Sequence, residues 1–267
     1  MNLGIIGYPL KHSISPRVHK ALLDHYGIEG NYLAFEVKPD DLRDAIFGAR
    51  ALGFSGLNVT IPYKEEVLKF VEPVGDARLA VNTIDLTEMK GYNTDIYGVE
   101  MAFRNAGIDV EKKVALIFGA GGAGKAIAIA LMKLGATVVI TNRTPRRGIE
   151  AASLLREYGD CIFYPVEKVG EIKYDIIANA TPVGMKGFPG MPFDEKLLRE
   201  GLVVFDAVYN PLETALIRKA KERGCKVING LEMFVYQAQK SFEIWTGIRP
   251  EIGLVRKFAI EALRIQK

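Results

Sequence analysis

The sequence predicts an α/β fold made of two domains, and three observations support this prediction. Apolar, strand-like segments alternate with helix-like segments along almost the whole chain, which is typical of mainly parallel sheets. A glycine-rich turn follows a short apolar segment near the middle of the chain, as expected for a nucleotide-binding unit. Two long helix-like segments come last and have no strands of their own, so they must pack on one of the two units.

The first half of the chain contains strand-like segments separated by helices. The first two helices have Ser or Pro near their start and Gly at their end, which are the usual start and stop signals of helices. The predicted strands are 3–8, 32–37, 54–60 and 80–86, and the predicted helices are 15–27, 39–53 and 62–71.

The second half repeats this alternation, beginning with a helix over 95–107 for which Asp95 is the predicted N-terminal cap. The two α/β units therefore meet near residue 95. The strands predicted after it are 113–119, 136–142, 174–180 and 201–208, and the helices are 124–135, 145–159, 212–224, 231–246 and 250–266.

Length and composition limit the classes of protein to which the chain can belong. Its 267 residues are 49% hydrophobic and 25% charged, as in ordinary globular proteins. The formal net charge is only +3, so we expect no general nucleic-acid-binding surface. The N-terminus lacks the basic start of a secretory signal, and the longest apolar stretch is interrupted by glycines and Lys125. We therefore expect a cytoplasmic protein with no membrane span.

Cysteine and histidine form no metal-binding pattern in the sequence. Cys161 and Cys225 each begin a strand-like segment without CxxC spacing, so we expect buried free thiols and no disulfide framework. The three histidines lie within the first 25 residues, and no HExxH motif or Cys/His cluster occurs. The sequence therefore predicts no metal.

The glycine-rich turn has the pattern G-x-G-x-x-G at Gly119, Gly121 and Gly124. It follows an apolar strand and opens an alanine-rich helix, which is the context in which this pattern binds a dinucleotide. Glycines let the backbone approach a pyrophosphate, and the helix N-terminus supplies N–H groups. The alternative is a tight turn that binds nothing, and we weight dinucleotide binding above it.

The next strand ends at Asn142, in the segment "TNRTPRRG", which contains no acidic residue. In many nucleotide-binding domains an Asp or Glu at this place holds a ribose hydroxyl. Here Arg143 and, four residues later, Arg147 offer guanidinium groups that suit a 2′-phosphate. The alternative is a solvated basic helix start, which the helix dipole disfavours. The segment therefore favours NADP over NAD.

Polar residues of the first half gather where predicted strands end, which is where open α/β sheets build their sites. Ser13 and Ser15 suit a carboxylate or a polyol, while Ser15 as a helix cap is an equally good interpretation. For Lys64 the alternative is a surface lysine in the first turn of a helix, and for Asp95 it is a simple N-cap. The other candidates in this half are Asn58, Thr60 and Asn82.

Segments after the later strands of the second unit, "ATPVGM" and "DAVYNP", add candidates at the carboxyl edge of that sheet. The helix in "NGLEMFVYQ" adds residues four positions apart on one face. A residue such as Gln237 is by itself most often a surface glutamine. The candidates are Thr181, Met185, Ala207, Tyr209, Gly230, Met233 and Gln237.

With these motifs the chain resembles the shikimate dehydrogenases. The segments "HSISP", "NVTIPYK", "AVNT", "GYNTD", "GAGGAGKA", "NRT", "TPVGM", "DAVYNP" and "NGLEMFVYQ" occur in the family's order over essentially the whole length. The resemblance implies reversible, NADP-dependent reduction of 3-dehydroshikimate to shikimate in aromatic amino-acid biosynthesis. It also implies a substrate-binding and catalytic domain (1–95 plus 231–267, so that the last helices return to it) and a Rossmann-type NADP-binding domain (96–230).

The resemblance also implies a role for each candidate. Lys64 and Asp95 would form the catalytic acid–base pair. The substrate would be bound by Ser13, Ser15, Asn58, Thr60, Asn82, Tyr209 and Gln237. The cofactor site would be lined by Gly119, Ala120, Gly121, Gly122, Ala123, Gly124, Asn142, Arg143, Thr144, Arg147, Thr181, Met185, Ala207, Gly230 and Met233.

One segment departs from the family, because "VGDARLAVNT" is a few residues shorter before "AVNT" than is usual, which puts the local structure before Asn82 in question. Three alternatives remain open: a quinate/shikimate dehydrogenase with relaxed substrate or cofactor choice, a methylenetetrahydrofolate dehydrogenase, and a non-catalytic nucleotide sensor. A sensor would keep the glycine loop but have no use for Lys64 together with Asp95. We expect a small-molecule substrate as the partner, and either a monomer or a homodimer.

Overall fold

The structure is a computed structural model that describes residues 1–10 and 13–265. Lys11 and His12 of the "KHSISP" segment, and residue 266 of the last predicted helix, lie outside the described residues. The chain forms two compact units, unit 1 with Met1–Thr94 and Val235–Lys267, and unit 2 with Asp95–Phe234. One boundary thus falls inside helix α7 (Gly230–Thr246), whereas the sequence places it at the start of that helix.

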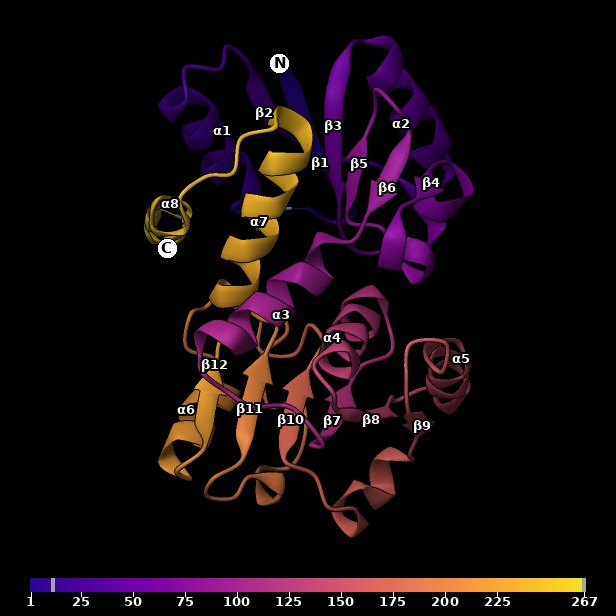
Figure 1. Cartoon of the computed structure of the whole chain (residues 1–267), viewed down its shortest axis with the longest axis vertical. Coiled ribbons are helices and arrows are strands. Elements are labelled where there is room, and N and C mark those ends of the chain that lie inside the picture. Colours follow the sequence, from indigo (N-terminus) through magenta and orange to yellow (C-terminus); the bar gives the residue numbers. More distant parts are fainter. Residues whose placement is uncertain (11–12, 266–267) are drawn as a thin grey trace. The chain divides into compact units, whose positions relative to one another are not determined.

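The sheet of unit 1 has six strands in the order β2-β1-β3-β5-β6-β4 (Figure 1). Strand β1 runs parallel to β2 and β3, as the βα alternation predicts. Strand β5 is antiparallel to both β3 and β6, so β5 and β6 form a hairpin that the alternation did not predict. The strands are β1 (Asn2–Gly7), β2 (Asn31–Glu36), β3 (Phe54–Val59), β4 (Glu72–Pro73), β5 (Thr83–Asp85) and β6 (Lys90–Tyr92).

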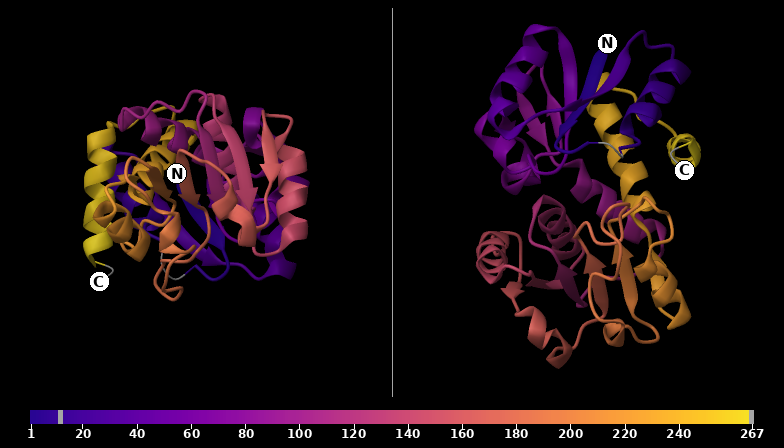
Figure 2. Two further views of the ribbon diagram at one scale, coloured as in Figure 1. Left: turned by 90° about the horizontal axis from the view of Figure 1, so that it is seen from below. Right: turned by 180° about the vertical axis from the view of Figure 1, so that it is seen from behind.

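Helices α1 (Ser15–His25) and α8 (Ile252–Ile265) pack against each other, although they lie at opposite ends of the chain (Figures 1 and 2). Helix α2 (Leu42–Ala51) contacts β3. The core on the α2 side of the sheet includes Ile6, Ile46, Leu57, Val67 and Ile84, and burying each such side chain fully contributes about 1.5–3 kcal/mol. Unit 1 also has three 3-10 helices, η1 (Pro39–Asp41), η2 (Glu66–Lys69) and η3 (Gly75–Leu79).

The predicted helix over 62–71 is wrong, because the chain forms a turn there and then only the short helix η2. The carbonyl oxygen of Lys64 accepts a hydrogen bond from Val81 N at 2.7 Å. A carbonyl that is used in this way by a distant segment is less available to the i+4 ladder of an α-helix. Contact with the segment before Asn82 therefore overrides the local helical pattern.

The sheet of unit 2 has six strands, all parallel, in the order β12-β11-β10-β7-β8-β9. Counted along the chain from β7 this is the order 3-2-1-4-5-6 of the doubly wound dinucleotide-binding fold, and the order reverses between β7 and β10. The strands are β7 (Val114–Phe118), β8 (Thr137–Thr141), β9 (Cys161–Phe163), β10 (Ile176–Asn179), β11 (Val203–Asp206) and β12 (Lys226–Ile228).

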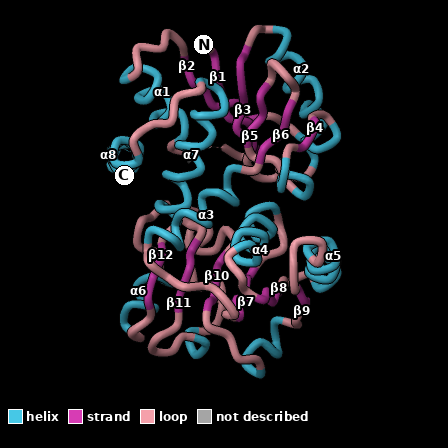
Figure 3. Tube along the Cα trace, in the orientation of Figure 1, coloured by secondary structure: helices cyan, strands magenta, loops and turns pink. Residues whose placement is uncertain are grey.

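The helices of unit 2 alternate with these strands along the chain (Figure 3). They are α3 (Thr94–Asn105, whose first residue belongs to unit 1), α4 (Gly122–Lys133), α5 (Pro145–Leu155) and α6 (Ala215–Glu222), with 3-10 helices η4 (Val166–Glu171) and η5 (Glu195–Leu197). The core includes Leu116, Ile177, Val204, Leu216 and Ala220. The prediction of an α/β fold with two sheets and C-terminal helices on the first unit is confirmed.

The two cysteines differ in their surroundings. Cys161 is buried, as expected, and burial raises the pKa of its thiol to about 11. Cys225 is only partly buried, so the expectation of a buried thiol is wrong there, since its Sγ lies at the edge of the core, where it donates to the carbonyl oxygen of Arg199. Among the described residues no helix is long and apolar enough to cross a membrane, and no group of His, Cys, Asp and Glu is suited to hold a metal ion.

Candidate active site

The polar segments that follow β1 and β3 leave the same edge of the unit 1 sheet. Thr60 N donates to Ile6 O at 3.0 Å, and Tyr8 N donates to Ile61 O at 3.0 Å. Because β1 and β3 are parallel neighbours, their carboxyl ends meet at this edge, which is where sites form in such sheets. Thr60 and Lys64 are both partly buried there.

Ser15 does not cap helix α1. The helix begins at Ser15 itself, its N-cap residue is Ile14, and no side chain caps it. Ser13 Oγ instead accepts a hydrogen bond from Ser15 N at 3.3 Å. The capping interpretation of Ser15 is therefore wrong, and Ser15 is a buried hydroxyl in the first turn of a helix.

Lys64 lies in the turn between β3 and η2 and not in the first turn of an α-helix. A helix dipole therefore plays no part in its placement, contrary to the sequence argument. The Lys64 carbonyl bonds to Val81 N, directly beside Asn82. This hydrogen bond holds the backbone of Lys64, the predicted proton donor, next to Asn82, a predicted substrate-binding residue.

Asp95 is not the N-cap of α3, because the helix already begins at Thr94. The Thr94 N–H is instead satisfied by Asn82 Oδ1, which accepts from it at 2.8 Å. Asp95 is the second residue of the helix and is 5% exposed. A residue twelve positions earlier thus satisfies the helix start, and the Asp95 carboxylate is not needed for that purpose.

Asn58 is engaged entirely with the protein on its donor side. Its Nδ2 lies 3.0 Å from both Asn82 O and Thr83 Oγ1 and 3.2 Å from Ser241 Oγ, while its Oδ1 accepts from Tyr32 OH at 2.6 Å. An amide nitrogen has only two protons. Asn58 therefore has no donor left for a ligand.

Gln237 is 8% exposed, so it is not a surface glutamine. It lies in the part of α7 that belongs to unit 1, which is held to the sheet by Trp245 Nε1 donating to Ile84 O at 3.0 Å. The C-terminal segment thus returns to the first unit, as predicted.

The three glycines of the turn after β7 serve different purposes. Gly119 has a φ of +112°, which residues with a side chain rarely adopt. A Cβ on Gly124 would lie 2.0 Å from Gly119 O, so only glycine permits this close packing of α4 on the turn. A Cβ on Gly121 would meet nothing within 4 Å, and no side chain caps α4 at this residue. The turn therefore has open space and uncapped N–H groups, which suit a pyrophosphate.

Asn142 joins the glycine turn to the arginine segment. Its Oδ1 accepts from Ala120 N at 3.3 Å, and its Nδ2 donates to Thr144 O at 2.9 Å. Arg146 is paired with Glu150 at 2.8 Å, whereas in the part of the chain that the structure describes Arg143 and Arg147 form no ion pair. Both of these arginines are exposed, so their charge can bind a ligand anion.

The remaining cofactor candidates lie after β10, after β11 and at the start of α7. A Cβ on Gly230 would lie 2.4 Å from Ala207 O, so the start of α7 packs directly on the segment after β11. The Tyr209 ring lies 5.0 Å from that of Phe234. Met233 is buried, while Thr181, next to Asn179, and Met185 are partly buried.

Sequence reasoning missed a buried polar group at the carboxyl edge of this sheet. Asp206 Oδ1 accepts from Asn179 Nδ2 at 2.9 Å and from Val208 N at 3.1 Å, and its Oδ2 accepts from Thr214 Oγ1 at 2.6 Å. Burial raises the pKa of Asp206, although the three hydrogen bonds oppose this shift. The group ties the "TPVGM" and "DAVYNP" segments together. In the sequence the group is indicated only by Asn179 and Asp206, the polar residues that end β10 and β11.

The two units divide the candidate residues between them. Unit 1 contains Lys64, Ser13, Ser15, Asn58, Thr60, Asn82 and Gln237, and unit 2 contains Asp95, Tyr209 and every cofactor candidate.

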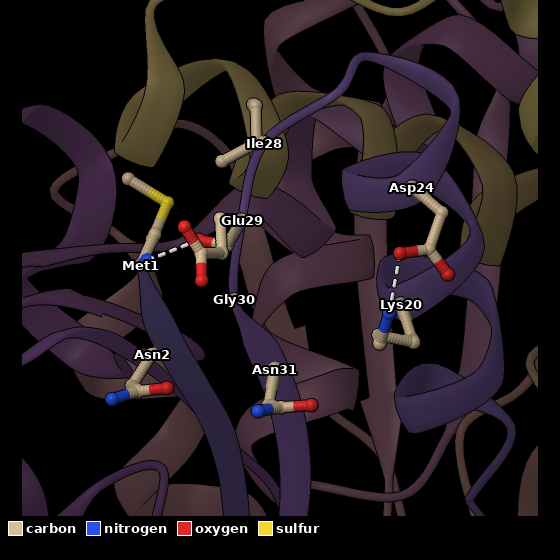
Figure 4. A pocket seen from close by; sticks show the side chains of 8 residues that line it. All are labelled: Met1, Asn2, Lys20, Asp24, Ile28, Glu29, Gly30 and Asn31. Atoms are coloured by element: carbon tan, nitrogen blue, oxygen red, sulfur yellow. Dashed lines mark hydrogen bonds and ion pairs between the residues drawn. The ribbon is translucent and has the colours of Figure 1, made fainter.

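A groove elsewhere in unit 1 is not part of this site (Figure 4). It lies at the amino ends of β1 and β2, the edge of the sheet opposite to Thr60, and it contains the ion pair of Lys20 with Asp24. It is lined by Met1, Asn2, Lys20, Asp24, Ile28, Glu29, Gly30 and Asn31.

Two known domain families match the chain. Residues 5–84 match the shikimate dehydrogenase substrate binding domain, and residues 230–257 match the shikimate 5'-dehydrogenase C-terminal domain. A protein from Archaeoglobus fulgidus named shikimate dehydrogenase (NADP(+)) is 58% identical over 267 residues, with 98% of each chain covered. The chain belongs to the shikimate dehydrogenase family.

Solved structures of similar sequence have the same fold. A shikimate dehydrogenase in complex with NADP+ matches with a TM-score of 0.90 and 39% identity, covering 98% of this chain and 95% of that one. A quinate dehydrogenase from Corynebacterium glutamicum in complex with NAD matches with a TM-score of 0.89 and 30% identity, covering 98% and 99%. Shikimate and quinate dehydrogenases therefore share the fold, and the site must decide between their substrates.

Proposed function

We propose that the chain catalyses the reversible, NADP-dependent reduction of 3-dehydroshikimate to shikimate in aromatic amino-acid biosynthesis. The observation that carries this proposal is the 58% identity, over almost the full length of both chains, to a protein named shikimate dehydrogenase (NADP(+)). Membership of this family sets aside the methylenetetrahydrofolate dehydrogenase alternative.

The cofactor proposed for unit 2 is NADP, and the residues there suit it. The uncapped N–H groups of α4 at Gly121 and Gly122 would bind the pyrophosphate. Arg143 and Arg147 would bind the 2′-phosphate, and Asn142 would hold the two segments in place. When bound, the cofactor supplies or accepts the hydride.

The proton transfer is proposed for Lys64 and Asp95. Reduction of a ketone builds negative charge on its oxygen, and the Lys64 ammonium would stabilise this charge and donate the proton. In the oxidative direction the amine would take the proton back from the shikimate hydroxyl. Asp95, as the acidic partner, would orient Lys64 and accept a hydrogen bond from a neighbouring substrate hydroxyl.

The other site residues are proposed to hold the substrate. Ser13 and Ser15 would bind the carboxylate through their hydroxyls. Thr60, Asn82, Tyr209 and Gln237 would contact the ring and its hydroxyl groups. The amide of Asn58 has no donor to offer, so we propose that it orients its neighbours instead.

The proposal is tested by absorbance at the reduced-nicotinamide band, with shikimate or quinate and with NADP or NAD. We expect the highest kcat/KM with shikimate and NADP. Higher kcat/KM with quinate and NAD would assign the chain to the quinate branch of the fold. Binding of NADP without turnover of either substrate would favour the nucleotide sensor. The cytoplasmic location and the choice between monomer and homodimer remain predictions from the sequence.

A further inference from the structure

Three buried hydroxyl groups lie together beside the proposed substrate-binding residues of unit 1. We call Thr83, Thr94 and Ser241 the hydroxyl cluster. Thr83 Oγ1 lies 2.8 Å from Ser241 Oγ and 3.2 Å from Thr94 Oγ1, and the last two oxygens are 3.1 Å apart. The residues come from β5, from the first turn of α3 and from α7, and all three are buried. Ser241, which is distant in the chain, thus meets Thr83 and Thr94 at one triangle of hydroxyls.

The backbone N–H of Thr94 determines which way the Asn82 amide faces, and the hydroxyl cluster holds the amide in that orientation. The backbone N–H of Thr94 can only donate, so the Asn82 atom 2.8 Å from it must be the oxygen. Thr83 Oγ1 donates to the same Oδ1 at 3.0 Å, and Asn82 Nδ2 donates to Thr94 Oγ1 at 2.9 Å. The second proton of Nδ2 has no acceptor among the described residues. Asn82 is therefore held with one N–H to offer to a ligand.

Asn58 completes this arrangement from β3. Its Nδ2 lies within hydrogen-bonding distance of Thr83 and Ser241, and its Oδ1 is fixed by the hydroxyl of Tyr32. With its donors used up, Asn58 acts on the hydroxyl cluster and not on the substrate.

A network of this kind is an unusual way to stabilise a core. Burying hydroxyls and amides is unfavourable unless each is paired, and apolar side chains can fill the same space. A hydrogen-bonded network does, however, hold its members in place. Thr94 directly precedes Asp95, and Ser241 lies four residues after Gln237, on the same face of α7. The hydroxyl cluster therefore touches or adjoins three proposed site residues.

We propose that the hydroxyl cluster positions the substrate site by holding Asn82 with an N–H toward a substrate oxygen. Through Thr94 the cluster also fixes the start of α3, which contains Asp95, and through Ser241 it fixes the face of α7 that contains Gln237. The inference rests on the proposed function, in which these three residues act on the substrate. The substrate group that Asn82 recognises is accordingly a hydrogen-bond acceptor, a hydroxyl or carbonyl oxygen. Thr83, Thr94 and Ser241 are positioning residues, since none of them needs to touch the substrate.

The test is a matched pair of substitutions at the centre of the triangle. Thr83→Val keeps the shape of the side chain and removes the hydroxyl, whereas Thr83→Ser keeps the hydroxyl and removes the methyl group. We expect Thr83→Val to lower kcat/KM for shikimate by about threefold to tenfold, the scale of one net hydrogen bond. Thr83→Ser should stay within about twofold of the wild type, and NADP affinity should change in neither variant, since every cofactor candidate belongs to unit 2.

Two results would overturn the inference. One is a Thr83→Val enzyme with wild-type kcat/KM, and the other is a Thr83→Ser enzyme as impaired as Thr83→Val, which would show that the methyl group packs and the hydroxyl does not matter. If Thr83→Val does not fold, Ser241→Ala replaces it, with the same expected loss, and a Ser241→Ala enzyme with wild-type kcat/KM overturns the inference equally. A wild-type chain that turns over neither shikimate nor quinate overturns the proposed function, and this inference with it; an active wild type separates the two.

Discussion

Unit 1 and unit 2 both contain a six-stranded sheet with helices, yet they build their parts of the candidate site from different groups. In unit 2 the groups are backbone N–H groups at the start of α4 and exposed arginines that follow β8. In unit 1 they are largely buried side chains, and the orientation of Asn82 depends on Thr83 and Thr94. A backbone site depends on a few glycines, whereas a side-chain site depends on its neighbours. Substitutions at Lys64 and its neighbours in unit 1 should therefore affect turnover of the substrate, and those at the glycine turn and the exposed arginines of unit 2 should affect affinity for the cofactor.

The largest effect is expected at Lys64 of unit 1. Lys64→Ala should lower kcat by roughly a hundredfold or more, the scale of a lost acid–base group, with little change in the KM of the substrate. Lys69→Ala is the matched control, because Lys69 is an exposed lysine of the neighbouring helix η2, paired with Glu66. Steady-state kinetics with shikimate and NADP check both variants. If kcat stays within about threefold of the wild type and KM rises instead, Lys64 binds the substrate and does not transfer the proton.

The arginines of unit 2 should show the opposite pattern. Each charged hydrogen bond is worth about 1.5–3 kcal/mol, so Arg143→Ala with Arg147→Ala should weaken NADP binding by at least about a hundredfold, allowing for non-additivity. The NAD affinity should change far less, since NAD has no 2′-phosphate. Arg146→Ala should change neither affinity, because Arg146 is already paired with Glu150. Dissociation constants for both cofactors decide the matter, and an equal loss for NAD and NADP would contradict a 2′-phosphate site.

Gly121 and Gly124 lie in the glycine-rich turn after β7, and substitutions there should affect stability and cofactor binding separately. Gly124→Ala places a Cβ 2.0 Å from Gly119 O, so it should lower the free energy of unfolding by about 1–3 kcal/mol. Gly121→Ala enters open space, so it should leave stability within about 0.5 kcal/mol while weakening NADP binding. Denaturant unfolding and NADP titration of the two variants provide the comparison. Equal losses of stability would show that the space at Gly121 is not free for a ligand.

The free energy of unfolding of unit 1 should also depend on pH. His19 is fully buried, its ring stacks on Tyr32 at 4.6 Å, and burial lowers its pKa from 6.5 to about 3. Between these two values the unfolded chain binds a proton that the native state does not, so the free energy of unfolding falls as the pH falls. The slope is up to about 1.4 kcal/mol per pH unit below 6.5, and the stability is fully present above it.

His19→Phe keeps the stacked ring and removes the titrating group, so denaturant unfolding between pH 7 and 4 should show a shallower slope for this variant. His25→Gln is the control, because His25 is an exposed histidine of the same helix. This variant should have the same slope as the wild type. An identical slope in wild type and His19→Phe would mean that other groups cause the loss of stability in acid.

The sequence by itself determined the overall class, the alternation of strands and helices in unit 2 and the nature of its ligand. Parallel βα units produce a contiguous pattern of apolar strands and helices, and the signals of the cofactor site lie within short segments. The glycines of the turn are spaced by the geometry of one strand-to-helix connection, and Arg143 follows the next strand directly. Such local signals can be recognised without knowledge of any distant contact.

Only the tertiary structure decided the details of unit 1. The turn at Lys64, the satisfaction of the start of α3 by Asn82 and the meeting of Thr83 with Ser241 depend on contacts between separate segments of the chain. The hairpin of β5 and β6 joins neighbouring segments, but the alternation of strands and helices does not predict it. Hydrogen bonds between such residues leave no periodic pattern, and a buried threonine has the same letter as an exposed one. The network that orients Asn82 therefore exists only once β5, the start of α3 and α7 have come together, because each supplies hydrogen-bonding groups to it.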